Sequence, residues 1–136
     1  MVIKASRSHN YDPVLLERLL FKVSKRWIAG YSNNDAMIEA KKSNNNGMSA
    51  ILNYLGEGYV EKSQIDRSVT EYITLLDLLK SKDVSGSISV KPTQIGLSVG
   101  YDKCLENFNK ISERAKQSGH FMWIDIESSN FVEDTL

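Results

Sequence analysis

Hydrophobic positions repeat at helical spacing in four stretches of the chain, and short apolar runs lie between the later ones. The first helix is predicted over residues 13–25, because Asp12 is a favourable N-cap residue and a proline opens the stretch. The second begins after Ser32, where Asp35 three residues later completes the pattern of a capping box. The asparagine run at residues 44–46 and the glycine after it predict where this helix ends.

The third and fourth helices have the clearer apolar faces. Residues 65–79 carry isoleucine, valine, tyrosine and leucine on a wide face, and Ser63 with Asp66 resembles another capping pair. Residues 104–115 form a narrower apolar stripe, and Gly119 has the place of a helix-ending glycine.

Three short apolar runs predict strands, at residues 48–55, 87–91 and 120–126. The first two are each followed by a predicted helix, and the runs repeat at roughly 35 residues, the size of a βαβ unit. The order is therefore helix, helix and then βαβαβ, which favours an α/β fold with parallel strands and right-handed crossovers. This pattern alone fits both a closed barrel and an open sheet.

The strand ends carry the candidate chemistry, because α/β proteins place their sites at the carboxyl ends of parallel strands. In the run 87–91 the isoleucine and valine share one face, and the two serines share the other with Lys91. In the run 120–126 Asp125 shares a face with Phe121 and Trp123. If the aliphatic faces pack on helices, Lys91 and Asp125 point the same way and flank one ligand. The alternative is a simple ion pair that closes the end of a sheet.

Composition narrows the classes of function. The chain has 136 residues with 17 basic and 17 acidic side chains, and this balance argues against a nucleic-acid partner. Cys104 is the only cysteine, which excludes an internal disulfide and a cysteine-based metal site and fits a reducing compartment. The two histidines lack ligand-spaced partners, so we expect no metal. No apolar run approaches the ~18 residues of a transmembrane helix.

Four segments resemble proline dehydrogenases of the short, single-function type. They are Arg26–Gly30 (RWIAG), Leu52–Glu57 (LNYLGE), Ser89–Leu97 (SVKPTQIGL) and Ile124–Ser128 (IDIES). They are similar to an Arg-aromatic/aliphatic-Ala-Gly segment, a Leu-Asp-x-Leu-Gly-Glu strand, a Ser-Val-Lys-x-Thr-Gln-Leu-Gly-Leu segment and an Ile-Asp-Met-Glu-x-Ser segment of that family. Their order and spacing agree with the family over roughly residues 14–136.

The resemblance implies the opening of a (β/α)₈ barrel. Residues 1–46 are then an N-terminal helical segment, and residues 47–136 supply the first three parallel strands of the barrel. The family's later strands and last helix carry most of its FAD contacts and an arginine pair that binds the substrate carboxylate. We therefore expect a truncated barrel, which by itself is inactive.

The resemblance also implies an activity, the FAD-dependent oxidation of L-proline to Δ¹-pyrroline-5-carboxylate with a membrane quinone as electron acceptor. Lys91 matches the lysine that binds the substrate carboxylate. Asp125 matches the catalytic aspartate beside the substrate, with the work of positioning cationic groups. Ile126 stands where the family has a methionine that contacts the flavin. Asn53 replaces an aspartate of the first strand, which puts any role of charge there in doubt.

The implied location is the cytoplasm, with peripheral association at the inner face of the membrane, or the mitochondrion for a eukaryotic protein. Two alternatives remain open from the sequence. One is a small non-catalytic α/β domain that binds a ligand or regulates. The other is a degenerate barrel relative without activity.

Overall fold

The computed structural model describes residues 28–30 and 32–136. The chain divides into two compact units, residues 1–30 and 31–136, and all the elements described below belong to the second. The helix predicted over residues 13–25 lies outside the described residues. The predicted division of the chain at residue 46 stays a prediction. The helix before that point, α2 (Asn33–Asn45), packs on α3 (Lys62–Ser81) and β1 (Ala50–Asn53) within the second unit.

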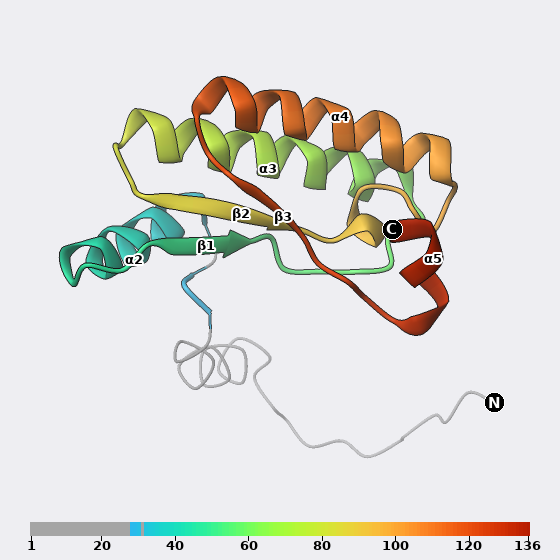
Figure 1. Cartoon of the computed structure of the whole chain (residues 1–136), viewed down its shortest axis with the longest axis horizontal. Helices are drawn as coiled ribbons and strands as arrows, with labels where there is room; N and C mark the ends of the chain where they lie inside the picture. Colours follow the sequence, from blue (N-terminus) through green and yellow to red (C-terminus); the bar gives the residue numbers. More distant parts are fainter. Residues whose placement is uncertain (1–27, 31) are drawn as a thin grey trace, which may run out of the picture. The chain divides into compact units, whose positions relative to one another are not determined.

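The second unit alternates helices and strands, as Figure 1 shows. In chain order the elements are α2 (Asn33–Asn45), β1 (Ala50–Asn53), α3 (Lys62–Ser81), β2 (Gly86–Val90), the 3₁₀ turn η1 (Pro92–Gln94), α4 (Tyr101–Ser118), β3 (Met122–Ile124), the 3₁₀ turn η2 (Ser129–Phe131) and α5 (Val132–Thr135).

Helix α2 begins as its sequence predicts. Ser32 is the N-cap, and its hydroxyl accepts a hydrogen bond from the Asp35 amide while the Asp35 carboxylate accepts one from the Ser32 amide. This reciprocal capping box satisfies donors that the first turn leaves unpaired. The helix ends at Asn45, inside the asparagine run. Asn44 then joins this end of the helix to Ser85, the residue before β2. Its side-chain amide donates to the Ser85 carbonyl, and its side-chain oxygen accepts the Ser85 amide.

The three strands form one parallel sheet in the order β1-β2-β3, which confirms the predicted βαβαβ arrangement. β1 and β3 are shorter than their predicted runs, whereas β2 has the predicted length and begins one residue earlier. The first run leaves the sheet after Asn53 because the next carbonyl, that of Tyr54, accepts a side-chain amide from Gln94. β3 ends at Ile124, one further backbone bond joins Asp125 to Val90, and Glu127 then turns toward Thr93. The carboxyl-terminal bounds predicted for the first and third strands were wrong for this reason.

Helices α3 and α4 cover one face of the sheet (Figure 1). Ile88 and Val90 of β2 are fully buried on this side, and the buried face of α3 supplies Tyr72, Leu76 and Leu79. The predicted alternation of β2 is confirmed, since Ser87 and Ser89 point away from the helix layer and bond side chains of the β3 segment.

The predicted start of α3 was wrong. Ser63 lies inside the helix, and its N-cap is Glu61, which makes no side-chain capping bond. Asp66 instead pairs with Lys62, one turn earlier. A charged partner attracts the carboxylate more strongly than a neutral backbone amide does, so the capping pair does not form.

The predicted end of α4 is confirmed. Gly119, which directly follows this helix, adopts the left-handed conformation with φ 75°.

None of the helices in the described ranges is long and apolar enough to cross a membrane. Within the same ranges, no group of three or more His, Cys, Asp or Glu side chains is placed to hold a metal ion.

Replacement of Ile88 by alanine tests the helix-covered core. Ile88 is 0 % exposed on the central strand, so we expect Ile88→Ala to lower the free energy of unfolding by about 2–5 kcal/mol. Urea unfolding followed by circular dichroism measures the change. The matched control is Ile38→Ala on α2, where the side chain is 55 % exposed and the expected change is within about 0.5 kcal/mol. Equal losses in the two variants would contradict this account of the core.

Candidate active site

Lys91 and Asp125 lie at the same edge of the sheet, directly after β2 and β3. The Asp125 amide donates a hydrogen bond of 2.9 Å to the Val90 carbonyl, which continues the parallel pairing past the last paired residues. Continuing the register of Val90 with Ile124 by one residue places Lys91 beside Asp125. We call this edge, formed by the carboxyl ends of the three strands and the loops after them, the carboxyl rim.

Asp125 is held by neutral donors from both other strands. Its Oδ1 accepts the Ser89 hydroxyl in a short hydrogen bond, and its Oδ2 accepts the Asn53 amide at 3.3 Å. Because Ser89 points away from the helix layer, Asp125 lies on the face of the sheet opposite α3 and α4. These two bonds fix the orientation of the carboxylate and leave its negative charge without a directly bonded cation among the described side chains.

Asn53 takes part in this site through its amide. It donates to Asp125 and also to the Ser89 carbonyl at 3.2 Å. An ionised aspartate could donate neither bond. At position 53 the amide therefore supplies a donor for Asp125, where an aspartate would add a second negative charge.

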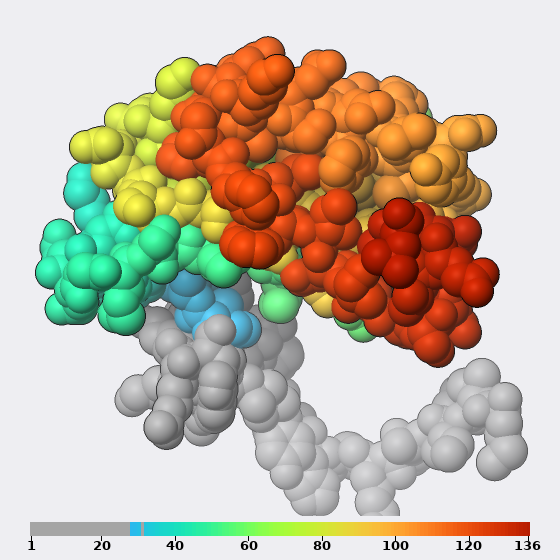
Figure 2. All heavy atoms as spheres, viewed as in Figure 1, coloured from blue at the N-terminus to red at the C-terminus, as the bar shows by residue number. Residues whose placement is uncertain are grey.

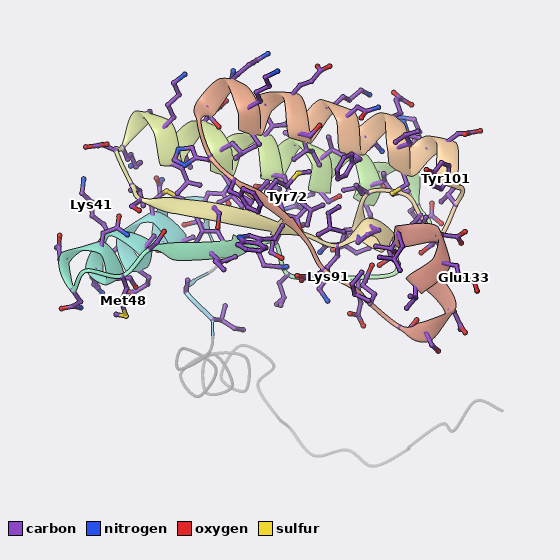
Figure 3. The ribbon with its side chains drawn as sticks, in the orientation of Figure 1. Lys41, Met48, Tyr72, Lys91, Tyr101 and Glu133 are labelled. Carbon is purple, nitrogen blue, oxygen red and sulfur yellow. The ribbon has the colours of Figure 1, made fainter. Side chains whose placement is uncertain are left out.

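Lys91 has a different partner from Asp125. Its ammonium lies 3.2 Å from the Glu57 carboxylate, which belongs to the loop after β1. The Lys91 side chain is 26 % exposed and that of Glu57 is 73 % exposed. The ammonium is thus partly shielded while its carboxylate partner faces solvent. Figure 3 shows Lys91 just beyond β2, at the side of the sheet where its carboxyl ends lie.

Two buried polar residues of η1 lie under the rim. The Gln94 amide donates to the carbonyls of Tyr54 and Gly56 at 2.8 and 2.7 Å, and its oxygen accepts the Tyr72 hydroxyl. Thr93 accepts the Gly58 amide at 2.8 Å and donates its hydroxyl and its amide to the Glu127 carboxylate. Burial raises the pKa of the Tyr72 hydroxyl far above its usual value, so this tyrosine stays a donor at all ordinary pH values.

Ile126 and Trp123 provide apolar surface near the rim. Ile126, directly after Asp125, is 55 % exposed. Trp123 is half exposed, donates its ring N–H to Ser87 at 3.1 Å and meets Phe121 edge-on at 4.7 Å between ring centroids. Trp123 shares the face that carries Asp125, so a planar apolar ligand could contact it there.

An apolar groove of about 130 Å³ lies on the other side of the sheet, between α4 and the C-terminal residues. Ile95, Cys104, Phe108 and Ile124 are among its lining residues, with Asp134 and Thr135 of α5 at its edge. Figure 2 shows the C-terminal residues against the start of α4. None of the charged residues of the rim that are named above lines this groove.

Strand parity predicts Lys91 and Asp125 at this rim, and the structure places both there. Ile126, which is named through the family resemblance, follows Asp125 in the chain. The sequence assigns no contact to Glu57, Ser89, Thr93 or Gln94. The available signal was the Pro92 that follows Lys91, because proline favours the first position of a helical turn and so predicts that the chain turns inward. The partners of the buried polar groups could not be predicted from that signal.

The sequence profile of a family described as Proline dehydrogenase matches residues 36–136. The chain belongs to the proline dehydrogenase family. Proline dehydrogenase 1 of Bacillus subtilis (strain 168) is 26 % identical over 113 residues, which cover 83 % of this chain and 37 % of the relative. Proline dehydrogenase 2 of the same strain is 26 % identical over 127 residues, covering 86 % and 42 %. The enzyme of Deinococcus radiodurans is 24 % identical over 125 residues, covering 90 % and 40 %.

The chain spans about two fifths of the length of these curated relatives. Among solved structures, proline utilization A (PutA) from Bdellovibrio bacteriovorus, inactivated by N-propargylglycine, superimposes with a TM-score of 0.79 at 16 % identity. The match covers 90 % of this chain and 15 % of that one. At this identity the likeness concerns the fold, and it confirms the expected α/β arrangement of a (β/α)₈ barrel.

The thiol of Cys104 gives a pH test of the packing behind the rim. Burial, and to a lesser extent the charge of Glu127, raises the pKa of this thiol to about 11. The raised pKa favours the protonated thiol in the folded state. The thiol's contribution to stability is therefore complete below the pKa of an unfolded cysteine, about 8.5, and is lost as the pH rises toward 11.

We expect the free energy of unfolding to fall between pH 8.5 and 10, and Cys104→Ala to reduce this fall. Urea unfolding at several pH values measures both slopes. Comparison at pH below 10 separates the thiol from Tyr72 and Tyr59, since burial raises the pKa of both hydroxyls above their usual value of 10. The same slope in the variant and the parent chain would show that the thiol is not buried as described.

Proposed function

We propose that the protein oxidises L-proline to Δ¹-pyrroline-5-carboxylate, with FAD as hydride acceptor and a quinone as electron acceptor. The observation that carries this proposal is the convergence of Lys91 and Asp125 at one rim, on adjacent parallel strands within the region that matches the family. A cation and a carboxylate at one rim are complementary to the carboxylate and the amino group of an amino acid.

Lys91 binds the substrate carboxylate in this proposal. A lysine ammonium has three N–H donors, and the contact with Glu57 uses one of them. Its partial burial strengthens the attraction for an incoming carboxylate, because fewer water molecules screen the charge.

Asp125 positions cationic groups beside the substrate, whose amine takes part in the reaction in its unprotonated form. Its carboxylate is already oriented by Ser89 and Asn53, so little reorganisation is needed when a cationic group approaches. The bonds that orient it come from neutral donors, and its charge remains available to the ligand. This is a role in positioning and electrostatics; a strong base is not required.

The described residues fit the flavin-ring end of FAD. The exposed side chain of Ile126 offers van der Waals contact to a flavin ring beside Asp125. The 136 residues contain no Gly-x-Gly-x-x-Gly or P-loop pattern. FAD, when bound, accepts the hydride that leaves the substrate carbon.

We further propose a cytoplasmic location at the inner face of the membrane, or a mitochondrial one for a eukaryotic source. This part of the proposal rests on the family's use of a membrane quinone. Peripheral association is its expected form.

Replacement of Lys91 tests the assigned binding role in the protein of full natural length. Purified protein should show flavin absorption and reduce a dye in the presence of proline. We expect Lys91→Ala to raise the KM for proline about 10- to 100-fold with a smaller change in kcat, because a charge-assisted contact to the substrate is lost.

The matched control is Lys80→Ala. Lys80 lies in the last turn of α3 and bonds the Gln117 carbonyl, toward the opposite ends of the strands, so its loss should leave KM unchanged. An unchanged KM in Lys91→Ala would contradict the role of Lys91. A colourless protein that oxidises no proline would contradict the proposed function as a whole.

A further inference from the structure

Glu57 owes its position to the residues on either side of it. Its carboxylate is largely exposed, and the side-chain contact described for it is the ion pair with Lys91. The backbone on both sides is anchored, however. The Gly56 carbonyl accepts a hydrogen bond from the Gln94 side-chain amide, and the Gly58 amide donates one to the Thr93 hydroxyl.

Gly56 and Gly58 let the loop take this path. Both have positive φ, 142° and 66°, which side-chain-bearing residues rarely adopt. A Cβ added at Gly56 would meet the Tyr59 hydroxyl at 2.0 Å. Tyr59 is itself bonded through its amide to the Thr93 carbonyl at 3.1 Å. The loop is therefore held against η1 at several consecutive points.

Thr93 and Gln94 can hold this loop because both carry buried polar side chains. Both are buried, at 2 % and 0 % exposure, so each polar group that they carry needs a partner. The Gln94 amide must face two carbonyls and its oxygen must face the Tyr72 hydroxyl, which defines a single orientation. The Thr93 hydroxyl links the loop after β1 to Glu127 after β3.

We infer that Thr93 and Gln94, which we call the η1 clamp, are positioning residues that hold Glu57 opposite Lys91. The clamp acts on the ammonium through Glu57 and does not touch a ligand. By tying all three loops of the carboxyl rim together, it keeps the Lys91 ammonium in the place where a carboxylate ligand would bind. This inference concerns the ion pair itself and extends to proline binding where the proposed function holds.

Lysine acylation followed by mass spectrometry tests the clamp directly on the 136-residue chain. A paired ammonium reacts slowly, and Glu57→Gln sets the rate for Lys91 without its partner. We expect Thr93→Val, which keeps the shape and loses the hydroxyl, to raise the acylation rate of Lys91 about fivefold, to the level of Glu57→Gln. Thr93→Ser, which keeps the hydroxyl, should restore the slow rate.

Two internal controls separate positioning from general loosening. Lys62 and Lys110 are paired with Asp66 and Glu106 on helix surfaces, and their acylation rates should not change. The Gly58 amide should exchange with solvent faster in Thr93→Val, while the Tyr59 amide, which bonds the backbone of Thr93, should not. Gln94→Glu replaces the amide that donates to two carbonyls, and it should raise the acylation rate of Lys91 as well.

The inference would be overturned if Lys91 reacted at the parent rate in Thr93→Val and Gln94→Glu while Glu57→Gln raised that rate. It would also be overturned if Glu57→Gln itself left the rate unchanged, because the pair would then not hold the ammonium. Neither result depends on enzyme activity, so a failure of the proposed function stays distinguishable.

The protein of full natural length, whatever that length is, supplies the functional test. Thr93→Val should raise the KM for proline several-fold with little change in kcat, and Thr93→Ser should restore it. A parent protein that oxidises proline, with a KM that Thr93→Val leaves unchanged, would remove the link from the clamp to binding.

Discussion

The central strand β2 is the constraint on which the structure depends. It pairs with both other strands and separates two different environments. Its aliphatic side chains, Ile88 and Val90, are buried under α3 and α4, and this burial removes apolar surface from water. The alternating serines then face the other side and bond Trp123 and Asp125. A shift of one residue in register would exchange these two faces, so the apolar pattern of β2 specifies the position of the polar site.

The polar contacts at the carboxyl rim follow from that arrangement. Parallel strands end together, and their last residues come from segments far apart in the sequence. Asp125 is oriented by Ser89 and Asn53, one donor from each of the other strands. Lys91 is paired with Glu57 from the loop after β1. The cation and the carboxylate of the candidate site thus have separate partners, and they do not neutralise each other in a simple ion pair at the end of the sheet.

Below the rim, buried polar groups must form hydrogen bonds with other groups of the protein. Thr93 and Gln94 enter the interior directly after Lys91, and an unpaired amide or hydroxyl there would cost about 1–3 kcal/mol. The loop carbonyls of Tyr54 and Gly56 and the carboxylate of Glu127 supply the partners. Stability of the core and geometry of the site are therefore coupled through the same few side chains.

The sequence by itself determined the order of elements within the described residues, the α/β class, the two faces of β2 and the placing of Lys91 and Asp125 at one rim. These follow from periodicity and strand parity, which are local properties of the chain. Only the tertiary structure decided the partners. Glu57, and not Asp125, pairs with the ammonium of Lys91. Asp66 pairs with Lys62 and forms no capping pair with Ser63. The Gln94 side-chain amide donates to the Tyr54 carbonyl, directly after the end of β1. Such choices depend on which polar groups meet when distant segments pack together, and one-dimensional spacing does not contain that information.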